Sequence, residues 1–139
     1  MSQSGHHTAM AGEFYTLSTL FRLGHEASLT LSNAKSIDIL SKSPSGNLYQ
    51  VQVKAVRAGG KWGVGRQSYA NVKNLVFVFL LFNDFDKPNE NPEAWIIPAK
   101  DVEKLKQPWL NETSAIYYSG KEEISKLADY KNAWSKHLA

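Results

Sequence analysis

The sequence predicts a single α/β domain in which a mixed central sheet is flanked by helices. Three observations lead to this class. Residues 9–25 have the periodicity of an amphipathic helix, residues 48–56 alternate between apolar and polar side chains, and residues 75–82 are apolar throughout. A strand that is apolar on both faces is typical of a sheet covered on both sides. A length of 139 residues with 42% hydrophobic content fits one such domain.

The first helix is expected after a flexible polar tail over residues 1–8, so that the domain spans 9–139. Glu13 lies in the middle of the helix's apolar stripe, and Gly24 is expected to end the helix. The stripe consists of Met10, Leu17, Leu20 and Phe21.

A meander of strands is predicted next, over residues 28–31, 36–40 and 48–56, with a hairpin loop over 41–47. In the second strand, Asp38 lies on the face opposite its apolar neighbours Ile37 and Ile39. In the third strand, Val51, Val53 and Ala55 are expected to point inward, and Gln50, Gln52 and Lys54 to lie on the other face.

The remainder of the chain is predicted as alternating loops, strands and helices. The expected elements are a glycine-rich loop over 58–66, a central strand over 75–82, a surface loop over 83–92, a strand over 94–97, a helix over 99–106, an edge strand over 114–119 and an amphipathic helix over 121–138. Three tryptophans, Trp95, Trp109 and Trp134, are interpreted as core or interface anchors, and His25 as a capping or surface residue.

Composition excludes several classes of function. The absence of cysteine removes disulfides, thiolate nucleophiles and cysteine-bound metals, and fits a reducing compartment. The longest apolar run has eight residues, Leu75–Phe82, which is too short to cross a membrane. With no signal peptide in view, a cytoplasmic location is expected. No phosphate-cradling glycine motif precedes a Lys-Ser or Lys-Thr pair, so no nucleotide cofactor is expected.

Four polar residues are expected to meet in one pocket on a face of the sheet. If strands 36–40 and 48–56 pair as a hairpin, Asp38, Gln52 and Lys54 share a face, and the first helix brings Glu13 to the same place. Two neighbouring carboxylates need a compensating cation. Oxygen ligands of this kind suit Mg²⁺, with Mn²⁺ as a possible substitute. Asp38, Gln52 and Glu13 are therefore candidate metal ligands, and Lys54 is a candidate catalytic base or charge-stabilising group.

Each of these residues, taken alone, also has an ordinary structural explanation. A helix glutamate often lies at the end of an apolar stripe and reaches solvent, and alternating polar residues on a strand usually form its solvated face. The combination of a helix acid, a strand acid and a Gln-x-Lys flanked by valines favours the functional interpretation.

The segment Ser36-Ile-Asp38 followed by Gln52-Val-Lys54 resembles the core of the PD-(D/E)xK nuclease superfamily, the restriction-endonuclease-like fold. The resemblance covers roughly residues 9–100 and implies an αβββαβ core. It implies that Asp38 is the metal-binding aspartate, Lys54 the catalytic lysine, and Glu13 an additional helix carboxylate. Gln52 occupies the second acidic position, so this chain resembles the variant with Gln there. Ile37 stands where the family has proline.

A basic segment follows the predicted strand over residues 48–56 in a pattern typical of nucleic-acid binding. Arg57, Lys61 and Arg66 are interleaved with Trp62 and Tyr69 among four glycines. Basic side chains neutralise phosphates and aromatic rings stack on bases, so these five residues are candidates for nucleic-acid binding. A solvated, mobile hairpin is the alternative interpretation.

The leading hypothesis is a Mg²⁺-dependent endonuclease, of a general or junction-resolving kind, that hydrolyses DNA as a homodimer. The first alternative is a nuclease-fold module that binds nucleic acid or a protein partner without cutting, favoured by Gln52. The second is an ordinary α/β interaction protein whose charged strand face is merely solvated. The net charge of +3 permits a nucleic-acid partner without requiring one, and does not separate DNA from RNA.

Overall fold

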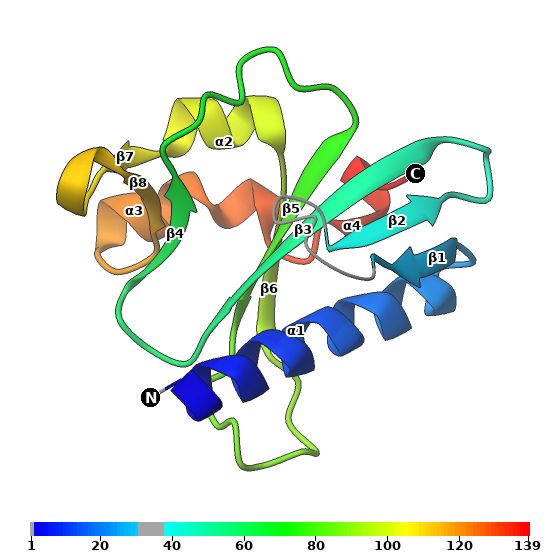
Figure 1. The fold of residues 1–139 in the computed structure, drawn as a ribbon, viewed down its shortest axis with the longest axis horizontal. Helices are drawn as coiled ribbons and strands as arrows, with labels where there is room; N and C mark the ends of the chain where they lie inside the picture. The colour runs from blue at the N-terminus through cyan, green and yellow to red at the C-terminus, as the bar shows by residue number, and fades with distance from the viewer. Residues whose placement is uncertain (1, 31–37) are drawn as a thin grey trace.

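The computed structural model describes residues 2–30 and 38–139, with side chains from residue 5 onward. Its main sheet has five strands in the order β1-β2-β3-β5-β6 (Figure 1). The pairing of β3 with β5 is parallel and the other pairings are antiparallel. This confirms the predicted mixed sheet. The strands are β1 Glu26–Leu29, β2 Ile39–Lys42, β3 Leu48–Val56, β5 Leu75–Leu81 and β6 Glu93–Pro98.

The predicted strand over 36–40 begins among residues that lie outside those described. Its described part is β2, which continues to Lys42 and so takes two residues from the predicted hairpin loop. Ile39 and Ser41 are buried while Leu40 and Lys42 are exposed, so the pleat of the strand extends as far as Lys42.

Helix α1, Ser2–Arg22, crosses the main sheet on the face of β3 that carries Val53 (Figure 1). The helix starts earlier than predicted, because residues 2–8, which were expected to form a tail, form its first turns. Thr8 in this segment is buried, and its hydroxyl accepts a 2.8 Å hydrogen bond from Arg57 Nε. At the other end, Gly24 has φ +88°, and the His25 amide donates to Leu20 O, so glycine ends the helix as predicted.

A second sheet covers the opposite face of the main sheet. Its strands are β4 Lys61–Gly65, β8 Ser114–Tyr117 and β7 Gln107–Pro108, in that order. The predicted glycine-rich loop is therefore largely a strand, and the predicted edge strand over 114–119 is the middle one. Trp62 and Val64 alternate into the core, which accounts for the strand. Gly63 lies against the Trp109 ring, where an added Cβ would be 2.9 Å from a ring carbon.

The connection from β3 to β5 differs from the expected αβββαβ order. It contains β4 and the loop over residues 66–74, and no helix. Helix α2, Ala99–Leu105, instead follows β6, at the place where a helix over 99–106 was predicted. The second sheet and α2 together occupy the face that a crossover helix would cover.

The C-terminal segment is not the single helix that was predicted over 121–138. Asn132 has φ +55° and donates its amide to Ala94 O at 2.9 Å, so the chain leaves the helical path to bond to β6. The result is three short pieces, α3 Lys121–Lys126, η2 Ala128–Tyr130 and α4 Trp134–His137. A further short turn, η1 Leu110–Glu112, links β7 to β8.

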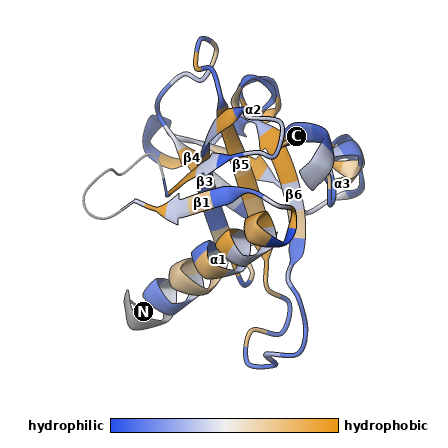
Figure 2. Cartoon of the chain, turned by 90° about the vertical axis from the view of Figure 1, so that its right-hand side faces the viewer, coloured by the Kyte–Doolittle hydropathy of each residue, from blue (hydrophilic) through white to orange (hydrophobic). Residues whose placement is uncertain are grey.

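Two apolar cores lie on either side of the main sheet. One is formed with α1 and Leu138, and the other with the second sheet and α2. All seven residues of β5 are buried, which confirms the predicted central strand, and Figure 2 shows it as largely hydrophobic. Among the described residues, no helix has the length and hydrophobicity needed to span a membrane.

Candidate active site

Asp38 directly precedes β2 and is bonded to β3 through both its backbone and its side chain. Its backbone amide donates to Val51 O at 3.0 Å. The Val53 amide donates to Asp38 Oδ2 at 2.8 Å. These two hydrogen bonds fix the position of the Asp38 carboxylate against β3. Among the described residues, the Val53 amide is the one hydrogen-bond partner of the Asp38 carboxylate. Its second oxygen, Oδ1, is therefore available to bind a metal ion or another ligand.

Gln52 and Lys54 lie next to Asp38 on β3. The pair Ile39–Val51 is the first in the β2–β3 register, and the Asp38 amide donates to Val51 O, so Asp38 lies beside the residue that precedes Gln52. Gln52 and Lys54 are two residues apart on one strand, so their side chains share a face. Gln52 is buried at 5% exposure and Lys54 is partly buried, because the second sheet covers this face of β3.

Glu13 approaches Asp38 from α1. The preceding residue, Gly12, lies against β3 so closely that an added Cβ would be 2.7 Å from Ala55 Cβ. A glycine at this point lets the helix backbone approach the sheet, which fixes the position of the next residue. The Glu13 side chain is half-buried and within electrostatic range of Asp38.

The ionisable groups of the site form an electrostatic chain with Asp38 in the middle. Burial, and then the negative charge of Asp38, raise the pKa of Glu13 above its usual range. Burial also raises the pKa of Asp38, against the opposing effects of the Val53 amide and the Lys54 ammonium. Burial lowers the pKa of Lys54, and Asp38 opposes that shift. The structure thus brings Glu13, Asp38 and Lys54 together, with Gln52 beside them.

The donor atoms of this site fit a hard divalent cation. Burial raises the pKa of both carboxylates, and the charge of Asp38 raises that of Glu13 further, so a bound cation would favour the charged forms of both groups. Gln52 adds a neutral amide oxygen of the kind that Mg²⁺ accepts. Within the part of the chain that the structure describes, no three His, Cys, Asp or Glu side chains gather in a way that could hold a metal.

Two of the residues predicted to bind nucleic acid are core residues instead. Trp62 is 0% exposed, and its ring packs against Phe79 and Trp95 while its Nε1 donates to Leu80 O at 2.9 Å. Tyr69 is 1% exposed. Neither ring can stack on a base, so these two predictions are wrong. The physical reason is that β4 and the following loop fold onto the main sheet rather than projecting into solvent.

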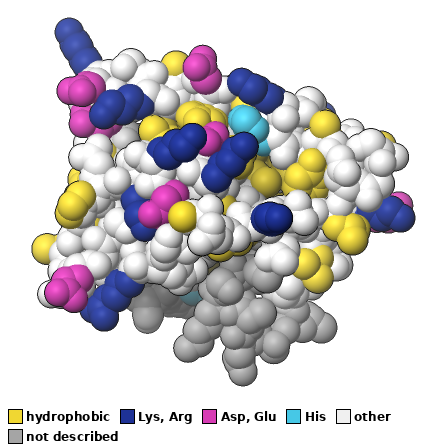
Figure 3. All heavy atoms as spheres, turned by 90° about the horizontal axis from the view of Figure 1, so that it is seen from above, with side chains coloured by type: hydrophobic (Ala, Val, Ile, Leu, Met, Phe, Trp, Pro, Cys, Tyr) yellow, Lys and Arg dark blue, Asp and Glu magenta, His cyan; other side chains and the backbone are white. Residues whose placement is uncertain are grey.

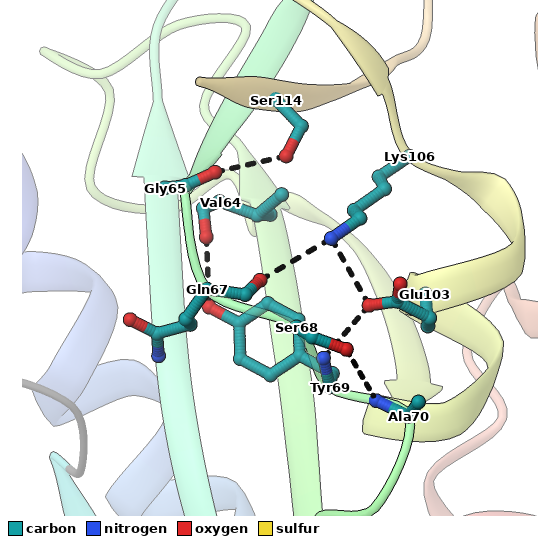
Figure 4. A network of polar contacts seen from close by, with 9 residues as sticks. All are labelled: Val64, Gly65, Gln67, Ser68, Tyr69, Ala70, Glu103, Lys106 and Ser114. Atoms are coloured by element: carbon teal, nitrogen blue, oxygen red, sulfur yellow. Dashed lines mark hydrogen bonds and ion pairs between the residues drawn. The ribbon is translucent and has the colours of Figure 1, made fainter. Parts of the chain in front are cut away.

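Tyr69 fixes the loop before β5 to α2 (Figure 4). Its hydroxyl donates to Val64 O at 2.7 Å, and its amide donates to Glu103 Oε1 at 2.7 Å. Lys106 joins the same network through Glu103 at 3.0 Å and Gln67 O at 3.2 Å. These contacts are internal to the fold. Tyr69 is therefore a structural residue, although it lies close to a basic segment in the sequence.

The three basic residues of that segment lie on different parts of the surface. Arg57 sits over the Phe85 ring, with Cζ 3.7 Å from its centre, and also bonds Thr8. Lys61 Nζ lies 5.0 Å from the centre of the Trp109 ring. Arg66 is exposed, just past the end of β4. They do not form one cluster with the carboxylates, and their proposed contacts with nucleic acid stay a prediction.

Sequence reasoning misplaced two further residues. Trp109, interpreted as an anchor, is 38% exposed and offers the aromatic surface beside Lys61 that was assigned to Trp62. The short polar loop around Trp109 was the sequence feature that could have indicated this exposure. His25, interpreted as capping or exposed, is 3% exposed and contacts Ser41 Oγ at 2.7 Å and Leu138 O at 2.8 Å. No local pattern indicates these long-range partners.

The fold resembles that of a solved bacterial homing endonuclease, I-Ssp6803I. The two structures match with a TM-score of 0.56, over 94% of this chain and 88% of that chain, at 15% sequence identity. At this identity the likeness shows the fold alone, which is an endonuclease-like mixed α/β fold. No protein-family model matches the sequence, and no curated protein matches it.

Proposed function

We propose that this chain is a metal-dependent endonuclease that hydrolyses phosphodiester bonds in DNA. The observation that carries the proposal is the placement of Asp38 within electrostatic range of both Glu13 and Lys54, with its carboxylate held against β3 by the Val53 amide. The site therefore combines carboxylate oxygen atoms with an ammonium group. Carboxylates can hold a metal ion, and an ammonium can stabilise negative charge on the phosphate, and both serve the hydrolysis of a phosphodiester.

Asp38, Glu13 and Gln52 would hold the ion, which we propose to be Mg²⁺ with Mn²⁺ as a substitute. When bound, such an ion supplies an activated water and neutralises charge on the phosphate. The Val53 amide fixes the orientation of Asp38 through Oδ2. The partly buried ammonium of Lys54 would stabilise negative charge that develops on the phosphate, and its lowered pKa also suits it to accept a proton from water.

The endonuclease-like fold supports this proposal, as does the name of the structural neighbour, a homing endonuclease. We assign the chain to the PD-(D/E)xK nucleases as a variant with Gln52 at the second acidic position, with DNA as its partner. The described residues of one chain present one such site, so cutting both strands of a duplex would use two copies. We therefore propose a homodimer as the working unit.

A second candidate function is a module that binds DNA without cutting it. The observation that favours it is the amide at Gln52, which leaves the site with two carboxylates and one negative charge fewer than an acidic residue would supply. A weaker ion site would reduce or abolish hydrolysis while the fold and its surface persist.

The deciding experiment is cleavage of supercoiled, linear and four-way-junction DNA in the presence of Mg²⁺, Mn²⁺ or EDTA. The variant Lys54→Met keeps an aliphatic chain of similar length in the partly buried position, and Lys87→Met is its control on an exposed loop. We expect cleavage by the wild type and Lys87→Met in either metal, no cleavage in EDTA, and a loss of about 100-fold or more in Lys54→Met.

Two results would contradict the proposal. Undiminished cleavage by Lys54→Met would remove the lysine from the site. Absence of cleavage by the wild type on all three substrates, with DNA binding retained, would establish the binding module instead.

A further inference from the structure

A pocket of about 580 Å³ opens at the end of the main sheet where β5 begins. Three separate segments surround it: the loop before β5, the start of α2 and the short helix α4, with Tyr49 of β3 as part of the wall. The lining residues that bear on its chemistry are Tyr49, Lys73, Asn74, Lys100, Lys136 and His137. No candidate active-site residue is among the residues that line it.

The described lining is basic and contains no acidic residue. Lys73, Lys100 and Lys136 are all exposed, and each comes from a different segment. In the view from above, several Lys and Arg side chains lie near a histidine, with hydrophobic side chains and an acidic one among them (Figure 3). Three ammonium groups around one hollow repel one another, and an anionic ligand would offset this repulsion.

The floor of the pocket is held in place by internal contacts. The His137 ring stacks on Tyr130, with ring centres 5.7 Å apart, and the Tyr130 hydroxyl donates to Asp101 Oδ2 at 3.0 Å. Burial, and then the charge of Lys136, lower the pKa of His137, with a smaller effect of Lys100 in the same direction and an opposing one of Asp101. The nearby carboxylate is thus engaged by Tyr130, and the positive charge of the pocket comes from its lysines.

We propose that this pocket binds a backbone phosphate of the DNA substrate outside the cleavage site. The inference rests on the proposed function, which it deepens by naming a second point of contact with the substrate. Tyr49 in the pocket wall and Lys54 in the candidate active site lie on the same strand, roughly 17 Å apart at about 3.3 Å per residue. That separation matches the axial rise of about five base pairs, at about 3.4 Å each.

The test compares two triple variants with equal change in net charge. Lys73→Gln, Lys100→Gln and Lys136→Gln remove the pocket charges, and Lys87→Gln, Lys121→Gln and Lys126→Gln remove three exposed charges elsewhere. Both are made in the Lys54→Met chain, so that a fluorescent DNA duplex is bound in Mg²⁺ without being cut. The midpoint of thermal unfolding confirms that each variant is folded. Affinity is measured by anisotropy over a range of salt concentrations.

We expect the pocket variant to lose about 10-fold or more in affinity, and its plot of log affinity against log salt to become shallower by about one, because the loss of one phosphate contact changes this slope by about one. The control variant is expected to keep the slope of its parent. Equal slopes in the two triple variants would overturn the proposal.

A second measurement identifies the source of the phosphate. The His137 imidazole resonance, assigned with a His137→Gln variant, reports directly on the pocket. A shift on adding the duplex supports the proposal, whereas a shift with inorganic phosphate and none with the duplex would assign the pocket to a small anion and overturn it. If the slopes differ as expected but the wild type never cleaves DNA, the pocket stands and the proposed nuclease activity fails.

Discussion

The backbone amide of Val53 donates a hydrogen bond to the side chain of Asp38. The same aspartate interacts electrostatically with Glu13 and Lys54. One residue thereby both bonds to β3 and organises the candidate site. Structure and proposed chemistry can be separated at this position, because an amide oxygen can accept the same hydrogen bond without carrying a charge.

The substitution Asp38→Asn is expected to preserve folding and to abolish metal binding. The asparagine Oδ1 can accept from the Val53 amide, while the site loses one of its two negative charges. Isothermal titration with Mn²⁺ should show one site in the wild type and a loss of at least 10-fold in affinity in the variant. Glu90→Gln, which removes a charge from an exposed loop, is the control. Equal Mn²⁺ affinity in Asp38→Asn and the wild type would exclude Asp38 as a ligand.

The substitution Gln52→Glu is expected to make folding depend more strongly on metal. A third carboxylate in a buried position beside Asp38 should cost about 1–3 kcal/mol in EDTA, and a bound cation should recover much of it. Thermal unfolding with and without Mn²⁺ measures both effects. Gln50→Glu adds the same charge on the same strand face, opposite Leu40, and should show a smaller metal effect. Identical metal effects in the two variants would argue against Gln52 as a ligand.

The stability of the metal-free protein is expected to fall as pH rises. Because the pKa values of Glu13 and Asp38 are raised by folding, the native state binds protons that the unfolded chain has released, and this contribution is lost as the pH rises through the raised values. Urea unfolding in EDTA, between about pH 4 and pH 7, should show the decline relative to a Glu13→Gln and Asp38→Asn double variant. Parallel curves for the two proteins would refute this expectation, and added Mg²⁺ should reduce the decline.

Trp62 and Trp109 are expected to differ sharply in their effect on stability. Replacing the fully buried Trp62 by alanine should cost about 3–5 kcal/mol, since it removes contacts with several rings and a bond to Leu80 O. The same change at the partly exposed Trp109 should cost about 1 kcal/mol or less. Urea unfolding measures both. A Trp62→Ala variant as stable as Trp109→Ala would mean that the second sheet does not pack as described.

The close contact between α1 and β3 predicts opposite outcomes at two glycines. Gly12→Ala brings a Cβ within 2.7 Å of Ala55 Cβ and should destabilise the fold by about 1–3 kcal/mol, while also displacing Glu13. Gly5→Ala has no atom within 4 Å of the new Cβ and should be neutral or stabilising by up to about 1 kcal/mol. Thermal unfolding measures both variants. If Gly5→Ala lowered the midpoint of thermal unfolding and Gly12→Ala left it unchanged, the described packing of α1 against β3 would be contradicted.

The sequence was informative where local pattern and tertiary structure agree. Alternation over residues 48–56 predicted β3 with its observed ends, and an apolar run predicted β5. Burial of one face of a strand selects apolar residues at alternate positions, and burial of both faces selects them at every position. The convergence of Glu13, Asp38 and Lys54 was also foreseeable, since strand pairing and helix periodicity together fix which faces meet. Their proposed roles stay predictions.

The sequence was misleading where distant segments determine the structure. Glycines around Lys61 are typical of a loop, yet pairing with β8 makes the segment a strand, and that partner lies far along the chain. Periodicity over 121–138 is typical of a helix, yet the bond from Asn132 to β6 interrupts it. The burial of Trp62 follows from the same long-range pairing, which short-range reasoning cannot detect.

The use of β4 in place of a crossover helix has a consequence for the order of folding. A helix between β3 and β5 could form from its own residues, whereas β4 completes its ladder only when Lys61 meets Tyr117. During synthesis, the cover over the Gln52 and Lys54 side of β3 must therefore wait until residue 117 has left the ribosome. Contacts so distant in sequence close slowly, so we expect this layer to be assembled last and to be the first to open under stress.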